Sequence, residues 1–330
     1  MKINMQSQTV PAMAAWLKNA RDRGVRDEAA LRELLNHPDY QVEFARYGQP
    51  NLPVCGIHYE EAVDFFLHFD GKKFENPRLD YKQEMFLAFY RDLDRRLEKI
   101  RMLQSITEQD LLLVQGLLEN ALPASALDAM PEITILLTVS IGNSMGWPYD
   151  HYVHFDVANL DAFQDKEEFL HVLAHELHHI FFSQLMPEDM TPRQYFFLNF
   201  AFEGLAMHFC NNAATMGKPA KYPGRSYCVD AASWAFFREQ HEPLLARVLA
   251  DGERAASMTM EQVEELLKFY EQFTFTSLKT GVTQTVQQYP TYYIGCLLWG
   301  KIDLALGKER LFEVLASRDG FPAAWAEANV

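Results

Sequence analysis

The strongest constraint on this chain is a five-residue segment, His-Glu-Leu-His-His, at residues 175–179. Apolar residues flank it at helical spacing, which predicts a helix over about residues 166–185. On that helix, His175 and His179 project from one face about one turn apart, so both imidazoles can reach a single tetrahedral Zn²⁺. Glu176 is displaced around the helix, yet it is close enough to act on a water at the same metal. Such a pentapeptide arises by chance in about one chain of this size in a hundred.

A catalytic zinc usually has three protein ligands and one open position. The metzincin continuation would require a glycine at position 182 and a histidine at position 185, but the chain has Phe182 and Leu185 there. Glu203 is the preferred third ligand, because it is a single acid in an apolar helical stretch, Phe-Ala-Phe-Glu-Gly-Leu-Ala at residues 200–206. A buried carboxylate without a partner is costly, and zinc would remove that cost. The alternatives for Glu203 are a surface position or a structural salt bridge.

Other side chains near the motif could also bind the metal. His171 lies one turn before His175, whereas His178 points away from the ligand pair, and both are expected to have ordinary packing or surface roles. Glu188 and Asp189 fall in the following loop and are expected to be exposed. His208 is a further alternative, although it lies off the Glu203 face of its helix.

The two segments together resemble the gluzincin branch of the zinc metallopeptidases, in which a glutamate on the helix after the motif helix is the third ligand. The Glu-Gly-x-Ala form at residues 203–206 and the Tyr-x-x-Gly form at residues 292–295 resemble zinc-dependent peptidase families of unknown function. The resemblance extends over about residues 130–315. It implies a zincin-like helical core, Zn²⁺ as cofactor, and a peptide or protein as substrate.

Two departures from the thermolysin-like pattern affect this reading. Twenty-three residues separate His179 from Glu203, which implies an enlarged connecting loop. Met207 stands where thermolysin-like enzymes carry an aspartate that orients a ligand histidine. The group that orients the histidines is therefore not identified by the sequence.

Zinc chemistry assigns roles to the remaining groups. Zinc lowers the pKa of its bound water and polarises the scissile carbonyl, and Glu176 is the expected general base. The oxyanion needs a further donor, for which Tyr292 and Tyr293 are candidates at the start of a helix. The alternative for each tyrosine is an ordinary buried role with a local partner. His151 and His154 near a predicted strand are weaker candidates.

The fold class is predicted as mainly α (α+β). Helical periodicity predicts helices over residues 11–21, 27–36, 59–69, 81–103 and 107–122, and it returns after residue 165. Asp165 is the expected N-cap of the motif helix, and Thr191 is the expected N-cap of a helix that starts at Pro192 and ends at about residue 211. Further helices are predicted over residues 230–249, 260–273 and 292–306. Between the two helical regions, residues 133–141 and 152–157 are predicted strands joined by a glycine- and proline-containing turn segment, expected to pair antiparallel as a small sheet beside the helical catalytic core. We expect a helical N-terminal lobe over residues 1–125 and a metallopeptidase domain over residues 126–330, possible also as one continuous domain.

Composition excludes some classes of function. The 45 acidic and 30 basic residues give a formal net charge of −15, which is the wrong sign for a nucleic-acid binder. The four cysteines are widely spaced and form no Cys-x-x-Cys pair, so neither a disulfide framework nor a thiolate zinc site is predicted. No signal peptide or membrane span is recognised, and a cytoplasmic protein is expected.

Three interpretations of the motif stay open at the level of sequence. A zinc metallopeptidase is preferred, in either an endopeptidase or an aminopeptidase mode. A zinc hydrolase of non-peptide amides or esters would use the same residues. A non-catalytic helical binding protein with structural zinc is disfavoured, because no fourth protein ligand is evident. The oligomeric state is not predicted.

Overall fold

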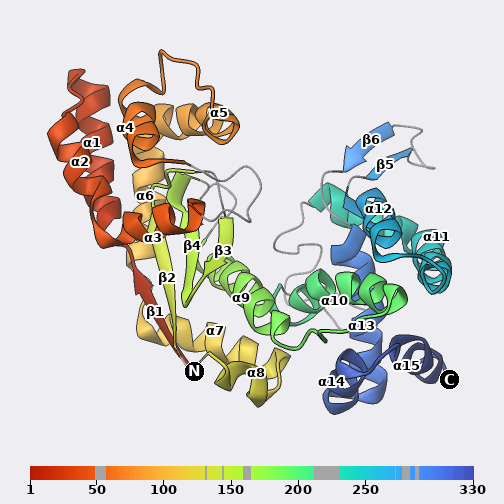
Figure 1. The fold of residues 1–330 in the computed structure, drawn as a ribbon. Coiled ribbons are helices and arrows are strands. Elements are labelled where there is room, and N and C mark those ends of the chain that lie inside the picture. Colours follow the sequence, from red (N-terminus) through yellow and green to blue (C-terminus); the bar gives the residue numbers. More distant parts are fainter. Residues whose placement is uncertain are drawn as a thin grey trace. The chain divides into compact units, whose positions relative to one another are not determined.

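The computed structural model describes residues 1–48, 57–130, 132–142, 145–158, 165–211, 231–271, 273–276, 283–286 and 290–330. The chain forms two compact units, each built from two segments (Figure 1). The first unit comprises Met1–Leu112 and Met130–Phe169, and the second comprises Leu113–Ala129 and Leu170–Val330. Independent folding of residues 1–125 and 126–330 stays a prediction.

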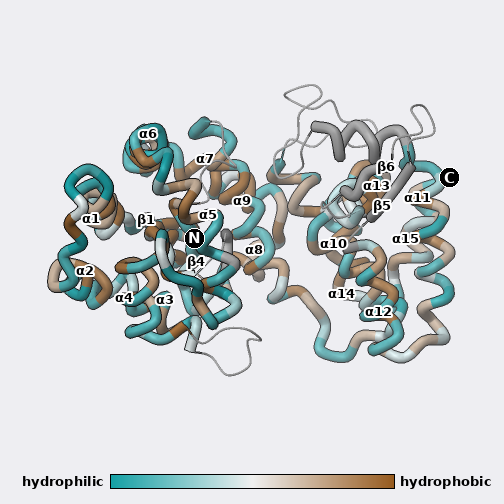
Figure 2. Tube along the Cα trace, turned by 90° about the horizontal axis from the view of Figure 1, so that it is seen from above, coloured by the Kyte–Doolittle hydropathy of each residue, from teal (hydrophilic) through white to brown (hydrophobic). Residues whose placement is uncertain are grey.

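Six helices of the first unit precede its sheet strands β2–β4 in the chain. They are amphipathic, and hydrophilic and hydrophobic residues alternate along their traces as expected for helices with one buried face (Figure 2). The sequence predicted most of them, but α3 was missed and residues 81–103 proved to hold parts of two helices. The helices are α1 (Thr9–Arg23), α2 (Glu28–Leu35), α3 (Pro38–Tyr47), α4 (Tyr59–His68), α5 (Pro77–Arg91) and α6 (Leu93–Gln104).

The sheet of the first unit has four strands in the order β1-β2-β4-β3: β1 (Lys2–Gln6), β2 (Glu132–Thr138), β3 (Met145–Tyr149) and β4 (Tyr152–Asp156). The predicted antiparallel pairing of the two apolar strands is wrong, because β2 and β4 are parallel. The reason is β3, which lies in the glycine- and proline-containing segment expected to be only a turn. It runs antiparallel to β4, so the chain reverses twice before β4 pairs with β2. Strand β1 was not predicted and lies parallel to β2.

Charged side chains form a fully buried network at the carboxyl ends of β2 and β4. The ammonium group of Lys82, on α5, donates to the carbonyl oxygens of Ser140 and Gly142 and lies 3.4 Å from Asp156. The carboxylate of Glu43, on α3, lies 3.3 Å from His154 Nε2 and accepts hydrogen bonds from Thr138, Ser140 and Ile141. We call Glu43, Lys82, His154 and Asp156 the buried network.

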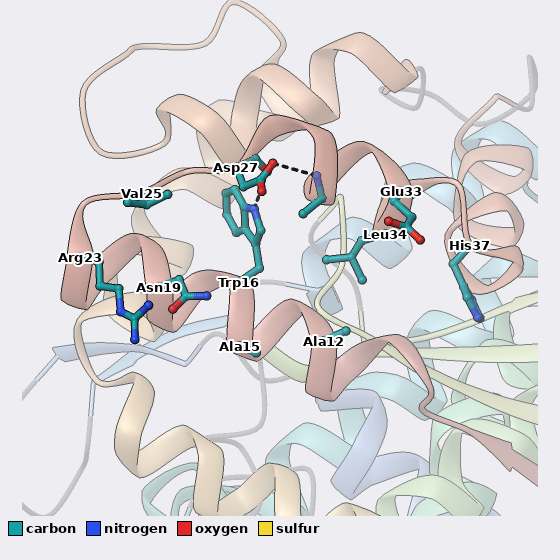
Figure 3. A pocket seen from close by; sticks show the side chains of 11 residues that line it. Ala12, Ala15, Trp16, Asn19, Arg23, Val25, Asp27, Glu33, Leu34 and His37 are labelled. Atoms are coloured by element: carbon teal, nitrogen blue, oxygen red, sulfur yellow. Dashed lines mark hydrogen bonds between the residues drawn. The ribbon is translucent and has the colours of Figure 1, made fainter.

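A groove of about 630 Å³ lies between α1 and α2 of the first unit (Figure 3). Trp16 forms part of its wall, and its indole N–H donates to the carbonyl oxygen of Asp27 at 2.8 Å. The Asp27 carboxylate in turn caps α2 by accepting a hydrogen bond from the backbone N–H of Ala30 at 3.1 Å. These two hydrogen bonds tie the Trp16 wall of the groove to the start of α2.

The second unit is helical apart from one hairpin. The predicted helix starts are confirmed: Asp165 accepts a hydrogen bond from the N–H of Glu168, and Thr191 caps the next helix ahead of Pro192. Helices α8, α14 and α15 and the hairpin were not predicted. The elements that begin or lie in this unit are α7 (Glu108–Ala121), α8 (Ala124–Asp128), α9 (Lys166–Ser183), α10 (Pro192–Cys210), α11 (Ala231–Ala255), α12 (Met260–Glu271), β5 (Phe273–Thr276), β6 (Thr283–Val286), α13 (Pro290–Leu306), α14 (Lys308–Ala316) and α15 (Phe321–Glu327).

Two glycines allow α10 and α13 to cross in backbone contact. A Cβ atom on Gly204 would lie 2.1 Å from the carbonyl carbon of Gly295, and one on Gly295 would lie 2.1 Å from the carbonyl oxygen of Phe200. Neither position can hold a larger residue without moving a helix. These are the glycines of the Glu-Gly-x-Ala and Tyr-x-x-Gly segments, so both segments have a packing role. No helix in the described ranges is long and apolar enough to cross a membrane.

Candidate metal centre

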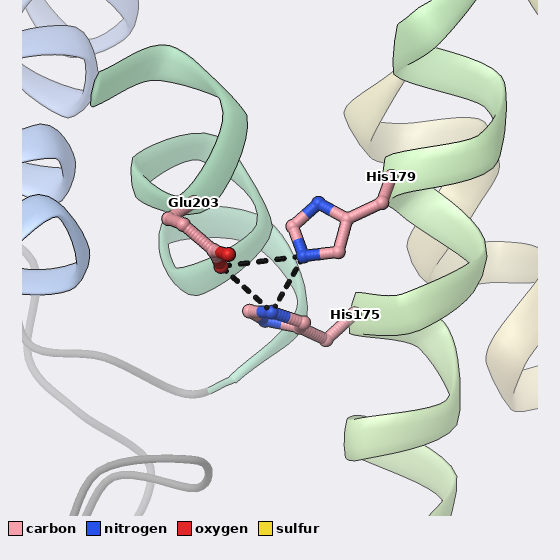
Figure 4. A group of neighbouring side chains, drawn as sticks. All are labelled: His175, His179 and Glu203. Carbon is pink, nitrogen blue, oxygen red and sulfur yellow. Dashed lines mark hydrogen bonds and ion pairs between the residues drawn. The ribbon is translucent and has the colours of Figure 1, made fainter. Parts of the chain in front are cut away.

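Helices α9 and α10 bring two imidazoles and one carboxylate to a common point (Figure 4). The Nε2 atoms of His175 and His179 are 2.9 Å apart. Glu203 Oε2 lies 3.1 Å from His175 Nε2 and 3.2 Å from His179 Nε2. Among the described residues, this is the one group of histidine, cysteine and acidic side chains with the spacing of a metal site. The structure therefore joins the three residues expected as ligands.

This donor set fits zinc. Tetrahedral zinc with bonds of about 2.0–2.1 Å separates its ligand atoms by about 3.3 Å, close to the three distances in this cluster. Two imidazole nitrogens and one carboxylate oxygen form a common catalytic zinc ligand set. Three acceptor atoms converging at this spacing repel one another unless a proton or a cation lies among them. We call His175, His179 and Glu203 the metal centre.

The ionisation of the metal centre reflects its need for positive charge. Burial favours the neutral form of the Glu203 carboxyl, but His179 and His175 outweigh burial and hold its pKa well below the usual 4.5. Burial also opposes protonation of His175, yet the Glu203 carboxylate prevails and raises the pKa of that imidazole above 6.5. A carboxylate and an imidazole that stabilise each other's charge in this way would release a proton when a divalent cation binds.

Asn211 orients one of the two histidines and was not anticipated from the sequence. Its Oδ1 lies 2.6 Å from His175 Nδ1, and both side chains are buried. Because an amide oxygen only accepts, Nδ1 carries the proton and Nε2 presents a lone pair to the metal centre. Asn211 is the C-cap residue of α10, eight residues after Glu203, and no local pattern marks it.

The second histidine is held differently. The ring of His179 stacks on the ring of Phe202 with centroids 4.1 Å apart and an interplanar angle of 3°. His179 Nδ1 is buried and has no hydrogen-bond partner among the described residues. The plane of this imidazole is therefore set by an aromatic contact.

Glu176, the expected general base, follows His175 on α9 and is partly buried. Burial raises the pKa of its carboxyl above 4.5, although the neighbouring His175 and His179 act in the opposite direction. No hydrogen bond fixes the Glu176 carboxylate within the described residues. Its catalytic role stays a prediction.

The structure separates the two candidate tyrosines. The ring of Tyr292 meets His175 edge-on, with centroids 5.9 Å apart. Tyr293 is buried, with 5% of its surface exposed. Tyr292 lies one turn before Gly295, so the glycine crossing of α10 and α13 brings it towards the metal centre.

The other histidines near the motif have packing roles. His171 Nδ1 lies 2.5 Å from the carbonyl oxygen of Cys210, and the buried ring of His178 stacks on Phe182. His208 Nε2 pairs with Asp303 Oδ2 at 2.7 Å. None of the three joins the metal centre.

The remaining alternatives also lie elsewhere. Glu188 and Asp189 are exposed, as expected, and are not in the metal centre. His151 pairs with Asp150 at an exposed turn, and His154 belongs to the buried network. Of the four cysteines, Cys210 and Cys296 are buried and form no disulfide, whereas Cys55 and Cys228 lie outside the described residues.

The fold and the metal centre define a class: a mainly helical protein whose motif helix and following helix offer two histidines and a glutamate to zinc. Residues 31–321 match the family described as "Putative zinc dependent peptidase (DUF5700)". Since the match covers most of the chain, the chain belongs to this family, and zinc is the cofactor that its description gives. No curated protein and no solved structure matches the chain.

Proposed function

We propose that this protein is a gluzincin-type metallopeptidase, in which His175, His179 and Glu203 hold zinc and Glu176 is the general base. The observation that carries the proposal is the convergence of the two Nε2 atoms and one carboxylate oxygen within 3.2 Å of one another. A structural zinc site is expected to have four protein ligands, whereas the described residues offer three, which leaves a position for water and substrate. The substrate is a peptide or protein.

Zinc, when bound, supplies a nucleophilic water at neutral pH and polarises the scissile carbonyl. Glu176 accepts the proton of the attacking water and passes it to the departing amine. Asn211 keeps the proton of His175 on Nδ1, so Nε2 stays available for coordination.

Tyr292 is the preferred donor to the oxyanion that forms when water attacks the carbonyl. Its ring touches His175, and its hydroxyl is a neutral donor that can stabilise negative charge beside the metal. Tyr293, on the same helix turn, is the buried alternative. Tyr292→Phe is expected to reduce turnover more than Tyr293→Phe.

The general base is tested by Glu176→Gln, assayed on a fluorogenic peptide library with Glu167→Gln as the control from the same helix. We expect the Glu176 variant to keep its zinc and to lose about 10²–10⁴-fold in turnover. Undiminished hydrolysis would remove Glu176 from its role. A parallel library of esters and non-peptide amides separates the peptidase from a zinc hydrolase of another class, and a zinc-loaded wild type inactive on both libraries would indicate a structural metal.

A further inference from the structure

We propose that Phe202 is a positioning residue of the metal centre, whose ring fixes the orientation of His179 and thereby sets the affinity for zinc. This inference rests on the proposed role of His179 as a ligand. It goes beyond that role because it assigns a function to an apolar side chain that neither binds metal nor contacts substrate.

The two histidines of the metal centre are supported unequally. A ligand histidine normally donates its second ring N–H to an oxygen atom, which fixes both the tautomer and the ring plane. His175 has this support from Asn211 at 2.6 Å. For His179, the corresponding Nδ1 is buried, and no described residue accepts a hydrogen bond from it. Another contact must therefore hold the ring of His179.

Phe202 makes that contact. At a centroid separation of 4.1 Å and an interplanar angle of 3°, its ring covers one face of the His179 imidazole. Such a stack resists rotation of the imidazole out of its plane, while both ring nitrogens remain in that plane. Nε2 is thereby kept pointing towards His175 Nε2 and Glu203 Oε2.

The stack also gains strength when the imidazole becomes electron-poor. The face of a phenylalanine ring is electronegative and attracts a cationic or polarised group placed over it. A metal on Nε2 draws electron density from the His179 ring, so the contact with Phe202 favours the metal-loaded form. Phe202 immediately precedes Glu203, and one turn of α10 therefore supplies both a ligand and the support of another ligand.

A second phenylalanine, Phe182, meets one edge of the Phe202 ring. The rings of Phe182 and Phe202 meet edge-on, with centroids 6.1 Å apart. Phe182 itself stacks on His178 at 5.4 Å, and no ring contact with His179 is found for it. Phe182 therefore provides a matched control, because it belongs to the same aromatic cluster but stacks on His178, which is not a member of the metal centre.

The test compares Phe202→Leu, Phe202→Tyr and Phe182→Leu in the full chain. Zinc affinity is measured by competition with a chromophoric chelator, and Co²⁺-substituted samples are compared by visible absorption, which reports coordination geometry. Urea unfolding of the metal-free proteins measures the loss of packing separately. We expect Phe202→Leu to weaken zinc binding by about 10–100-fold, the range for residues that orient metal ligands, and to alter the Co²⁺ spectrum.

Phe202→Tyr retains the ring and should stay close to wild type, and Phe182→Leu should lower stability without changing the Co²⁺ spectrum. The inference is overturned if Phe202→Leu binds zinc like the wild type, or if both leucine variants lose affinity only in proportion to stability. Because the assay needs no substrate, an inactive wild type that binds zinc would count against the peptidase and leave Phe202 untouched. A Phe202→Leu variant with normal zinc affinity, together with an active wild type, would overturn the role of Phe202 and leave the peptidase proposal intact.

Discussion

The buried network of the first unit and the metal centre of the second both set a histidine against a glutamate, but they satisfy their charges in opposite ways. In the buried network, the Lys82 ammonium has three acceptors for its three N–H groups. Glu43 and Asp156 accept from hydroxyl and backbone donors, including the N–H groups of Ser140 and Ala158 on Asp156 Oδ1. Every charge there has a partner within the protein.

In the metal centre, acceptors face acceptors. His175 Nε2, His179 Nε2 and Glu203 Oε2 lie within 3.2 Å of one another. The Glu203 side chain is 22% exposed, whereas Glu43 is fully buried. A buried carboxylate–histidine pair whose polar atoms all have protein partners therefore stabilises the fold. A partly exposed pair whose acceptor atoms converge is suited to binding a metal cation.

The largest expected effect is on the stability of the first unit. Lys82→Met leaves Asp156 and Glu43 buried without their cation and should lower the free energy of unfolding by about 3–5 kcal/mol. Urea unfolding measures this, and the folded fraction should bind zinc with unchanged affinity. Lys18→Met, which removes an exposed lysine paired with Asp22, is the control and should have little effect. A stable Lys82 variant would mean that the network contributes little to the fold.

In the metal centre, by contrast, removal of Glu203 is expected to lower the affinity for zinc and to leave the stability of the fold unchanged. Glu203→Ala removes one of three ligands and should weaken zinc binding by more than about 100-fold, the upper limit for residues that only orient ligands. Metal-free Glu203→Ala should unfold at nearly the same urea concentration as the wild type. Glu188→Ala, at the exposed loop glutamate, is the control. Zinc stoichiometry equal to that of the wild type would exclude Glu203 as a ligand.

Asn211 supports the metal centre with a buried hydrogen bond to His175, similar to the hydrogen bonds that hold the buried network together. Asn211→Ala should weaken zinc binding by about 10–100-fold, since His175 would lose the acceptor that fixes its tautomer. Asn211→Asp retains an acceptor oxygen and should recover most of the affinity. If both variants bind zinc as the wild type does, His175 needs no such partner.

The smallest expected effect is on how the free energy of unfolding depends on pH. Burial alone would raise the pKa of Glu43, but His154 and the hydroxyl donors prevail and hold it below 4.5. The carboxylate therefore stabilises the folded state above about pH 4.5, and that contribution is lost as the pH falls through the folded-state pKa, at about 1.4 kcal/mol per unit of lowering. Urea unfolding between pH 7 and pH 4 should show a shallower loss in Glu43→Gln than in wild type. Glu98→Gln, at an exposed residue of α6, should follow wild type.

Predictions from the sequence were correct where the physical cause is local. The spacing of His175 and His179 places them on one face because any α-helix does so, and the caps at Asp165 and Thr191 act within three residues. Glu203 could be singled out although it lies on a different helix from the motif, because a single acid in an apolar helix needs a partner. For that reason most helices of the second unit and the convergence of His175, His179 and Glu203 could be anticipated, and their role as ligands stays a prediction.

Predictions failed or were missing where the cause lies between segments that are distant in the chain. The direction of β4 depends on a third strand that resembled a turn, so the pairing was predicted antiparallel and is parallel. The burial of Lys82 and Glu43 was not predicted, because their partners lie 58 to 111 residues further along the chain. Whether a charged side chain is buried or exposed depends on whether the fold brings partners to it from distant segments.

The sequence alone determined that two imidazoles and an acid share one helix with zinc-binding spacing, since this follows from helix geometry and residue chemistry. It also marked Gly204 and Gly295, but not their purpose. Only the tertiary structure decided that these glycines let α10 and α13 touch, that Asn211 fixes the proton of His175, and that Phe202 covers the face of His179. Each of these is a contact between side chains or backbones from separate turns or helices, and its energy exists only when the helices have packed.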